Sequence, residues 1–210
     1  MPMDKEKEIR SINCNFEVRE VGEGENKQTH IQGYALKFGT LSEDLGGFRE
    51  LINKCALDNC DMSDVVLDFN HDFNKVLARN NKNNGVGSLV LTIDDTGLFF
   101  DAIPTDTSYS RDLIENMKNG IVNKCSFIFS LDWSDPDSQT WDWDDGSRGY
   151  DFRTINKFKS ISDVSVVVFP AYESTETSIY SRAKKEKNNE AEKAKKELEK
   201  RKQLIELELL

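Results

Sequence analysis

Long apolar runs, paired cysteines and histidines are scarce in this chain of 210 residues. No apolar run approaches the ~20 residues of a membrane-spanning helix. The charged start MPMDKEKEIR lacks the apolar region of an export signal. Cysteines stand at four separate positions without CxxC spacing: Cys14, Cys55, Cys60 and Cys125. Such spacing favours reduced thiols over a disulfide framework, and with two histidines it gives a zinc site little support.

Acidic residues outnumber basic ones. The formal net charge is -10, which disfavours binding to a phosphate backbone as the main activity. Residues 183–210 carry 9 Lys+Arg and 7 Asp+Glu, so residues 1–182 carry a balance of -12. The 12 Phe, 5 Tyr and 3 Trp are enough for a folded core, which makes full disorder a poor description.

Short apolar runs separated by turn residues predict a strand-rich body. Strands are expected on both sides of the polar turn 22–26 and over 65–69, 86–93, 98–103, 125–130 and 161–169. The turn Asp94-Asp95-Thr96-Gly97 predicts a hairpin. Helical spacing is read over 48–60 and 110–119, with Gly120 ending the second helix. Seven or eight strands and two or three short helices are expected in all.

The composition changes after Arg182. Residues 183–210 have no Gly, Pro or aromatic residue and are rich in strong helix formers, which predicts a helix. Its apolar residues gather at the end, at Leu204, Ile205, Leu207, Leu209 and Leu210. Such a helix gains most of its order from a partner, and a solvated charged leash is the alternative. The expected organisation is a flexible 1–10, a body 11–182 with an acidic flap or hairpin at 132–151, and a charged helical tail 183–210.

Two histidines are the candidates for a base that acts near neutral pH. His71 follows an apolar strand and lies between Asn70 and Asp72, the kind of strand end at which active-site residues concentrate. The alternative for His71 is a purely structural role. His30 lies inside a predicted strand, where a surface or pairing role is favoured.

Ser126 and Cys125 are candidate nucleophiles within one apolar strand. Adjacent strand residues face opposite sides, so only one of them can meet His71. No GxSxG motif is present, which argues against an α/β-hydrolase, and a structural role for the serine stays open. Asp163 interrupts the apolar run 161–169. If it is buried it needs a partner such as an imidazole N–H, and the alternative is a surface aspartate at a strand end.

The order of several short motifs resembles the prohead proteases of tailed bacteriophages. The matching pieces cover about residues 12 to 182. They are Gly33-Tyr34-Ala35 with Phe38, Glu50-Leu51-Ile52 with Ala56, Val65-Val66-Leu67 through Asn70-His71-Asp72, Gly97-Leu98-Phe99-Phe100, Pro104-Thr105-Asp106-Thr107, Asp112-Leu113 through Gly120-Ile121, Ser126-Phe127 with Phe129, Arg153-Thr154-Ile155, and Asp163-Val164-Ser165-Val166-Val167 through Pro170-Ala171-Tyr172.

The resemblance implies a serine endopeptidase of capsid maturation, with a mixed, β-rich fold. That fold is a β-barrel surrounded by short helices, similar to herpesvirus assemblin. The family's histidine, serine and acidic residue fall on His71, Ser126 and Asp163. Family members often have glutamate in place of Asp163, and glycine after the Ser-Phe pair where this chain has Ile128. Ser165, Asp72 and Asp68 are the alternatives to Asp163 as the residue that orients His71. No oxyanion donor is assigned.

The resemblance also implies partners and a location. The expected substrates are the scaffolding segment of the phage major capsid protein or a separate scaffold protein, and the protease itself by autoprocessing. The expected location is the host bacterial cytoplasm, inside the assembling procapsid. No cofactor, metal, nucleic acid or membrane is expected, and a homo-oligomer is compatible with the tail.

Two other functions compete with the protease. One is a capsid-assembly scaffold or interaction protein with an inactive protease-like body, which the helical tail would suit. The presence of both His71 and Ser126 argues against it. The other is a metal-dependent hydrolase, which the small number of metal ligands disfavours.

Overall fold

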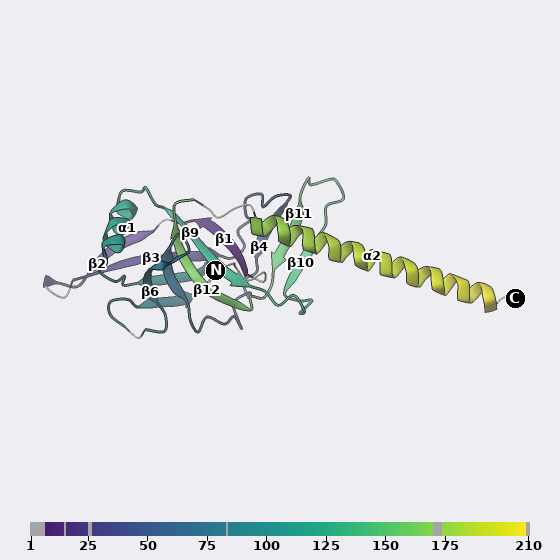
Figure 1. Ribbon diagram of the computed structural model, residues 1–210, viewed down its shortest axis with the longest axis horizontal. Helices are drawn as coiled ribbons and strands as arrows, with labels where there is room; N and C mark the ends of the chain where they lie inside the picture. The colour runs from purple at the N-terminus through teal and green to yellow at the C-terminus, as the bar shows by residue number, and fades with distance from the viewer. Residues whose placement is uncertain (1–6, 15, 25–26, 83, 170–173, 209–210) are drawn as a thin grey trace. The chain divides into compact units, whose positions relative to one another are not determined.

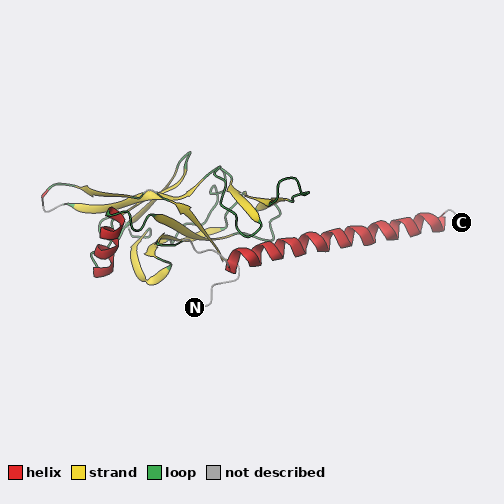
Figure 2. Cartoon of the chain, turned by 90° about the horizontal axis from the view of Figure 1, so that it is seen from above, coloured by secondary structure: helices red, strands yellow, loops and turns green. Residues whose placement is uncertain are grey.

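The computed structural model describes residues 7–14, 16–24, 27–82, 84–169 and 174–208. The chain divides into two units, Met1–Tyr172 and Glu173–Leu210. The first holds every described strand and helix α1 (Ser108–Lys118), and the second holds helix α2 (Ser174–Glu208) (Figures 1 and 2). Pro170, Ala171 and Tyr172 of the resemblance, and Leu209 and Leu210 of the tail, lie outside the described residues.

The described strands form three sheets. The first runs in the order β1 (Lys7–Asn13), β9 (Lys124–Ser130), β12 (Ser160–Val167), β5 (Val66–Phe69) and β6 (Asp72–Arg79). The second is β2 (Glu17–Val21), β3 (Gln28–Lys37), β8 (Gly97–Ala102) and β7 (Leu89–Ile93). The third is β10 (Gln139–Asp142), β11 (Asp151–Ile155) and β4 (Phe48–Ile52).

The fold is mixed and β-rich, as expected, but it contains no closed barrel among the described strands. Each sheet has two edge strands, for instance β1 and β6 in the first. The expected barrel surrounded by short helices is therefore not confirmed in the part of the chain that is described. The first unit carries a single described α-helix, α1.

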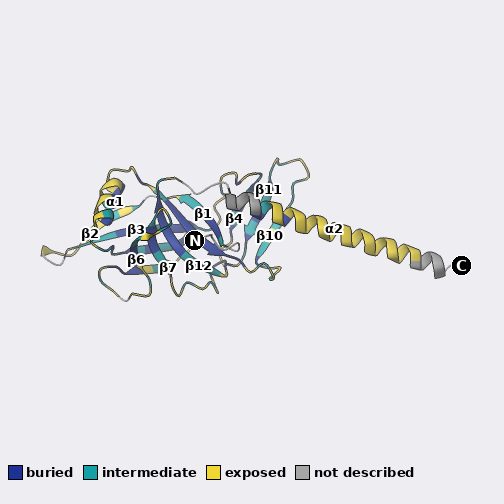
Figure 3. Ribbon diagram, viewed as in Figure 1, coloured by how far each residue is buried: buried dark blue, intermediate teal, exposed yellow. Residues whose placement is uncertain are grey.

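The core lies between the first two sheets. Alternate residues of β9, namely Cys125, Phe127 and Phe129, join one cluster with Ile31 of β3 and Phe100 of β8. Figure 3 shows this buried centre in dark blue. Because successive strand residues point to opposite sides, the intervening β9 residues face the other side of the sheet. That second face carries the polar residues of interest.

Several local predictions are confirmed. Residues on both sides of the polar turn form the antiparallel pair β2 and β3. The turn Asp94-Asp95-Thr96-Gly97 joins β7 and β8, where a Cβ at Gly97 would lie 2.0 Å from the carbonyl oxygen of Leu36. Helix α1 ends at Lys118, and Gly120 beyond it has φ 68°, a left-handed conformation that suits glycine.

The helix predicted over 48–60 is wrong. Residues 48–52 form β4, in which Phe48, Glu50 and Ile52 are buried in strict alternation. Because one of the buried positions, Glu50, is charged, the sequence shows no alternation of apolar residues here. The expected number of strands, seven or eight, is also too low, because twelve strands are described. Strand β6 is an example of one that was missed: it lies at a sheet edge, only Leu77 and Ala78 are buried, and its apolar pattern is weak.

The expected flexible N-terminus is wrong for residues 7–10. Residues 1–6 lie outside the described part, whereas Lys7 begins β1, which pairs along its length with β9. Glu8 and Arg10 of this strand are 2% and 5% exposed. Their charges made the segment look solvated, although both side chains are buried.

A buried ion cluster explains these buried charges. Arg153 of β11 donates to both carboxylate oxygens of Glu8, at 2.6 and 2.9 Å, and to Glu50 at 2.9 Å. Arg10 donates to both oxygens of Glu50, at 2.9 Å each. Burial disfavours the Glu8 carboxylate, but Arg153 and Arg10 outweigh that effect and lower its pKa. The cluster links β1 of the first sheet to β4 and β11 of the third.

Helix α2 carries charged side chains along most of its length. It begins at Ser174, earlier than the change in composition at Ala183 suggests. Residues 184–203 are exposed throughout (Figure 3). Neither described helix combines the length and low charge needed to cross a bilayer.

Replacing Arg153 with Met tests the ion cluster. The substitution leaves Glu8 and Glu50 partly uncompensated, and breaking a buried ion pair costs about 3–5 kcal/mol of unfolding free energy. The matched control is Arg111→Met, which breaks the exposed bridge to Asp106 and should cost less than about 1 kcal/mol. Urea unfolding measures both, and equal losses would contradict the structural role of the cluster.

Candidate active site

A row of polar side chains crosses one face of the first sheet. Ser126 of β9 is paired with Ser11 of β1 on one side and with Ser165 of β12 on the other. Ser165 is in turn paired with Asp68 of β5. Residues paired directly across strands point to the same side, so four adjacent strands bring these groups together. Asp163, two residues before Ser165, shares their face.

A tight turn brings the histidine to this row. Asn70 and His71 connect β5 to β6, and both have positive φ, 58° and 55°. Positive φ at both central positions is the signature of a type I′ hairpin turn. The backbone N–H of Asn70 donates to Val166 O at 2.9 Å, and the side-chain oxygen Oδ1 of Asn70 accepts from Val168 N at 3.1 Å. These bonds fasten the turn to β12.

The three residues expected from the sequence lie in hydrogen-bond contact. His71 Nε2 is 2.8 Å from Ser126 Oγ, and His71 Nδ1 is 2.8 Å from Asp163 Oδ1. Because a carboxylate faces Nδ1, the proton of the neutral imidazole belongs there. Nε2 is then free to accept the proton of Ser126. Hydroxyl, imidazole and carboxylate thus form one continuous chain.

The amide of His71 is also held. It donates to Ser165 Oγ at 2.9 Å and to Asp68 Oδ1 at 3.1 Å. From the sequence, Asp68 and Ser165 were alternatives to Asp163 and not members of the expected site. Both gave a signal, since Asp68 interrupts the apolar run 65–69 and Ser165 stands two residues after Asp163 in another one.

Ser126 is enclosed in this structure. Ser126 is 0% exposed, and besides His71 its hydroxyl contacts two residues of β1. Ser126 Oγ is 3.0 Å from the carbonyl oxygen of Arg10 and accepts from Ser11 Oγ at 3.0 Å. A peptide carbonyl can approach Oγ only when some of these contacts open.

Burial controls the ionisation of the site. Burial lowers the pKa of His71, which keeps the imidazole neutral and able to accept a proton, although the nearby Asp68 carboxyl opposes the shift. Burial raises the pKa of Asp163 to about 7, against the lowering effects of a hydrogen bond with Asp68 and of Lys7. Burial and the neighbouring Asp163 carboxyl raise the pKa of Asp68 to about 8.

The alternative site residues lie elsewhere. Cys125 points to the core side of β9, away from His71, and burial raises the pKa of its thiol well above the usual range. His30 belongs to the second sheet, where its Nδ1 lies 2.7 Å from Asp101 Oδ1. The Cys125 thiol lies 3.8 Å from the backbone carbonyl oxygen of Ser126, but no hydrogen bond among the described residues joins Cys125 or His30 to His71.

One group of described residues has metal-ligand composition. Donor atoms of Asp68, His71 and Asp163 lie within 4.8 Å of one another. However, Nδ1 of His71 sits at hydrogen-bond distance from Asp163 and Nε2 faces Ser126. This is the geometry of a hydrogen-bonded array, in which neither ring nitrogen is directed to a shared central ion.

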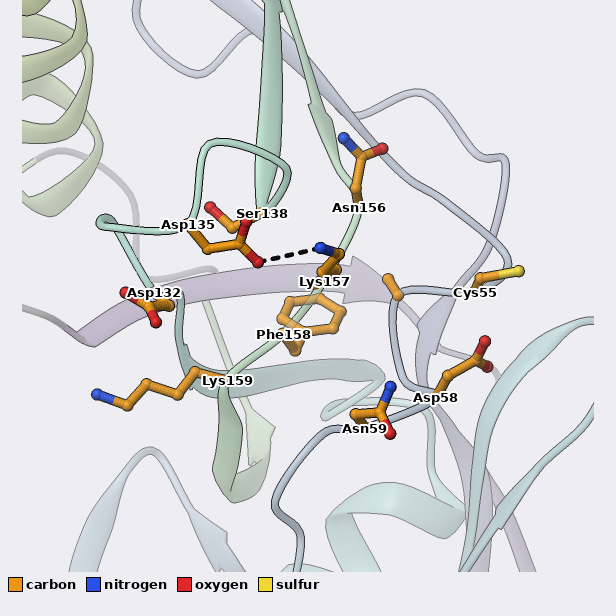
Figure 4. Close-up of a pocket in the computed structure, with 11 residues that line it drawn as sticks. Cys55, Asp58, Asn59, Asp132, Asp135, Ser138, Asn156, Lys157, Phe158 and Lys159 are labelled. Atoms are coloured by element: carbon orange, nitrogen blue, oxygen red, sulfur yellow. Dashed lines mark hydrogen bonds and ion pairs between the residues drawn. The ribbon is translucent and has the colours of Figure 1, made fainter.

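A pocket of about 380 Å³ lies apart from this array. Its lining includes Asp132, Ser138, Lys157 and Phe158 but none of His71, Ser126 and Asp163. In Figure 4, Lys157 reaches toward Asp135, with which it forms an ion pair at 3.0 Å. Because the lining includes no residue of the hydrogen-bonded array, the candidate chemistry stays with the polar row.

Comparison with protein families identifies the relatives of this chain. Residues 14–191 match the family described as caudovirus prohead serine protease. The chain belongs to that family. The match spans all the strands that carry Asp68, Ser126 and Asp163, and the turn that carries His71.

A solved structure agrees at the level of the fold. The capsid assembly protease gp21 of bacteriophage T4 superposes with a TM-score of 0.50 at 15% identity, covering 79% of this chain and 98% of that chain. No curated protein matches the sequence. The fold is therefore shared with a capsid assembly protease despite low sequence identity.

Thiol labelling tests the burial of Cys125 in the core. In the native protein, Cys55 is exposed and should react readily with iodoacetamide, whereas the buried Cys125 should react only after unfolding. Peptide mass mapping before and after urea treatment measures this order. Rapid native labelling of Cys125 would contradict the burial of its thiol in the core between the first two sheets.

Proposed function

We propose that this protein is a serine endopeptidase of phage capsid maturation, with Ser126 as nucleophile, His71 as general base and then acid, and Asp163 as the residue that orients His71. The observation that carries the proposal is the continuous chain of two 2.8 Å contacts through His71. Membership of the prohead serine protease family supplies the biological setting.

In the proposed reaction His71 first accepts a proton and then donates it, in both acylation and deacylation. As Ser126 Oγ attacks a peptide carbonyl, its proton passes to His71 Nε2 and the carbonyl oxygen becomes an oxyanion. Asp163 stabilises the imidazolium through Nδ1–H. His71 then gives the proton to the leaving amine while the C–N bond breaks. Water, deprotonated by His71, finally releases the acyl group and restores Ser126.

Because Ser126 is enclosed, substrate binding must change the contacts of its hydroxyl. The Ser126 hydroxyl has one proton, and it lies near two acceptors, His71 Nε2 and the carbonyl oxygen of Arg10. Attack requires that the proton go to His71. A bound peptide therefore has to displace the contact of Ser126 with β1 while leaving the contact with His71 intact.

The substrates we propose are the scaffolding segment of the major capsid protein or a separate scaffold protein, together with the protease's own termini. The reaction would take place in the assembling procapsid in the host cell. We assign catalysis to the first unit and a docking role to α2, whose charged surface suits contacts with scaffold or with a second copy of the chain. Similarity to herpesvirus assemblin stays a prediction.

Substitutions of the nucleophile and base test the proposal. On co-expression with the neighbouring capsid gene, Ser126→Ala and His71→Ala should each abolish processing of the capsid protein, with rate losses on the order of 10⁶-fold. The double variant should be little worse than either, because the two groups act as a unit. Intact mass of both proteins reports the cleavage.

His30→Ala is the matched control, because His30 also contacts an aspartate, Asp101, but lies in the second sheet. It should retain processing. If His71→Ala processes the capsid protein as wild type does, His71 is not the base. If Ser126→Ala remains active while Cys125→Ala does not, the nucleophile is the thiol.

A further inference from the structure

Two buried carboxyl groups meet behind the histidine. Asp68 and Asp163 are each 0% exposed, and an oxygen of one carboxyl group lies within 4.8 Å of an oxygen of the other. Oδ1 of Asp163 faces His71 Nδ1, and Oδ1 of Asp68 accepts from the amide of His71. The other oxygen of each group, Oδ2, is buried and has no hydrogen-bond donor among the described residues.

A single shared proton would remove the repulsion between the two carboxyl groups. Two ionised carboxylates in contact and shielded from water repel strongly, so one of them keeps its proton. Asp163 is the better anion because it faces the Nδ1–H donor of His71. A proton on Oδ2 of Asp68 would then be donated to Oδ2 of Asp163, and both unpaired oxygens would be satisfied by one hydrogen bond.

We propose that Asp68 is a positioning residue that stays protonated and donates a hydrogen bond to the Asp163 carboxylate. This inference rests on the proposed function of the site. Asp163 then has both oxygens engaged, one with His71 and one with Asp68, which fixes the carboxylate plane. With its amide contact as well, Asp68 holds both the side chain that orients the imidazole and the turn that carries it.

The surroundings of Asp68 favour the neutral acid. From β12 it meets Asp163 and Ser165, and from the turn after β5 it meets His71. The Cys125 thiol of β9 lies close enough to interact with both carboxyls, and Lys7 of β1 acts on Asp163. Among the described residues no lysine or arginine forms an ion pair with Asp68, and the basic group that acts on it is His71.

Three substitutions distinguish a neutral donor from an anion. Asn at position 68 keeps an oxygen for the His71 amide and an N–H for Asp163, so Asp68→Asn should rescue most of what Asp68→Ala loses. We expect Asp68→Ala to lower kcat about 10–100-fold, with Asp68→Asn within about 10-fold of wild type. Asp163→Asn should be worse, on the order of 10²–10⁴-fold, because the anion itself is lost.

Asp72→Asn is the matched control, since it makes the same change beside His71 at an aspartate whose side chain is 33% exposed, and it should retain wild-type kcat. If Asp68→Asn is as damaging as Asp163→Asn, Asp68 works as an anion and the proposal is wrong. If wild type itself does not process the capsid protein, the proposed function fails instead.

The pH profile separates a protonated donor from a merely structural residue. Wild-type kcat should fall above about pH 8, where Asp68 ionises and stops donating. Asp68→Asn cannot ionise, so this alkaline fall should disappear. An unchanged alkaline limb in Asp68→Asn would overturn the proposal.

Thermal melting gives a readout that does not depend on catalysis. The folded-state pKa of Asp68, about 8, lies above the ordinary 3.8. Its stabilising effect is complete below 3.8 and is lost as pH rises through 8. Between pH 5 and pH 9 wild type should therefore lose more melting temperature than Asp68→Asn. Equal losses would contradict a protonated Asp68 whether or not the protein is a protease.

Discussion

The register of β9 between β1 and β12 is the constraint on which the site depends. It sets Ser126 level with Ser11 and Ser165, and the pairing of β12 with β5 extends the row to Asp68. A shift of one residue would turn Ser126 into the core and bring Cys125 to His71. The phenylalanines that alternate with Ser126 fill the core and so hold the register, which makes packing on one face responsible for chemistry on the other.

Buried charges are stabilised differently on the two faces of the first sheet. On one, Glu8, Glu50, Arg10 and Arg153 neutralise one another through several short hydrogen bonds. On the other, Asp68 and Asp163 form no ion pair with an arginine among the described residues, and burial raises the pKa of both carboxyls. The first arrangement fixes β1 against the third sheet. The second leaves a polar array whose protons can move, as acyl transfer requires.

The sequence predicted the elements whose patterns are local. The β7–β8 hairpin, helix α1 with its glycine stop, and the apolar strands β9 and β12 could be read from turn residues and apolar runs. Strands β1 and β4 escaped because Glu8, Arg10 and Glu50 are buried through pairing with residues distant in the chain, which no local pattern records. His71, Ser126 and Asp163 were singled out by type and motif order. Asp68 was only an alternative to Asp163, because a role beside Asp163 depends on the pairing of β5 with β12, which the sequence does not record.

The most direct measurement identifies the nucleophile in a preparation that is cleaving capsid protein. Diisopropyl fluorophosphate added during processing should stop the cleavage and leave one phosphoryl group per chain, located on Ser126 by peptide mass mapping. The His71→Ala variant should take up no label under the same conditions, because Ser126 loses its base. Cleavage that stops with the group on another residue, or that continues while Ser126 is fully labelled, would contradict the account.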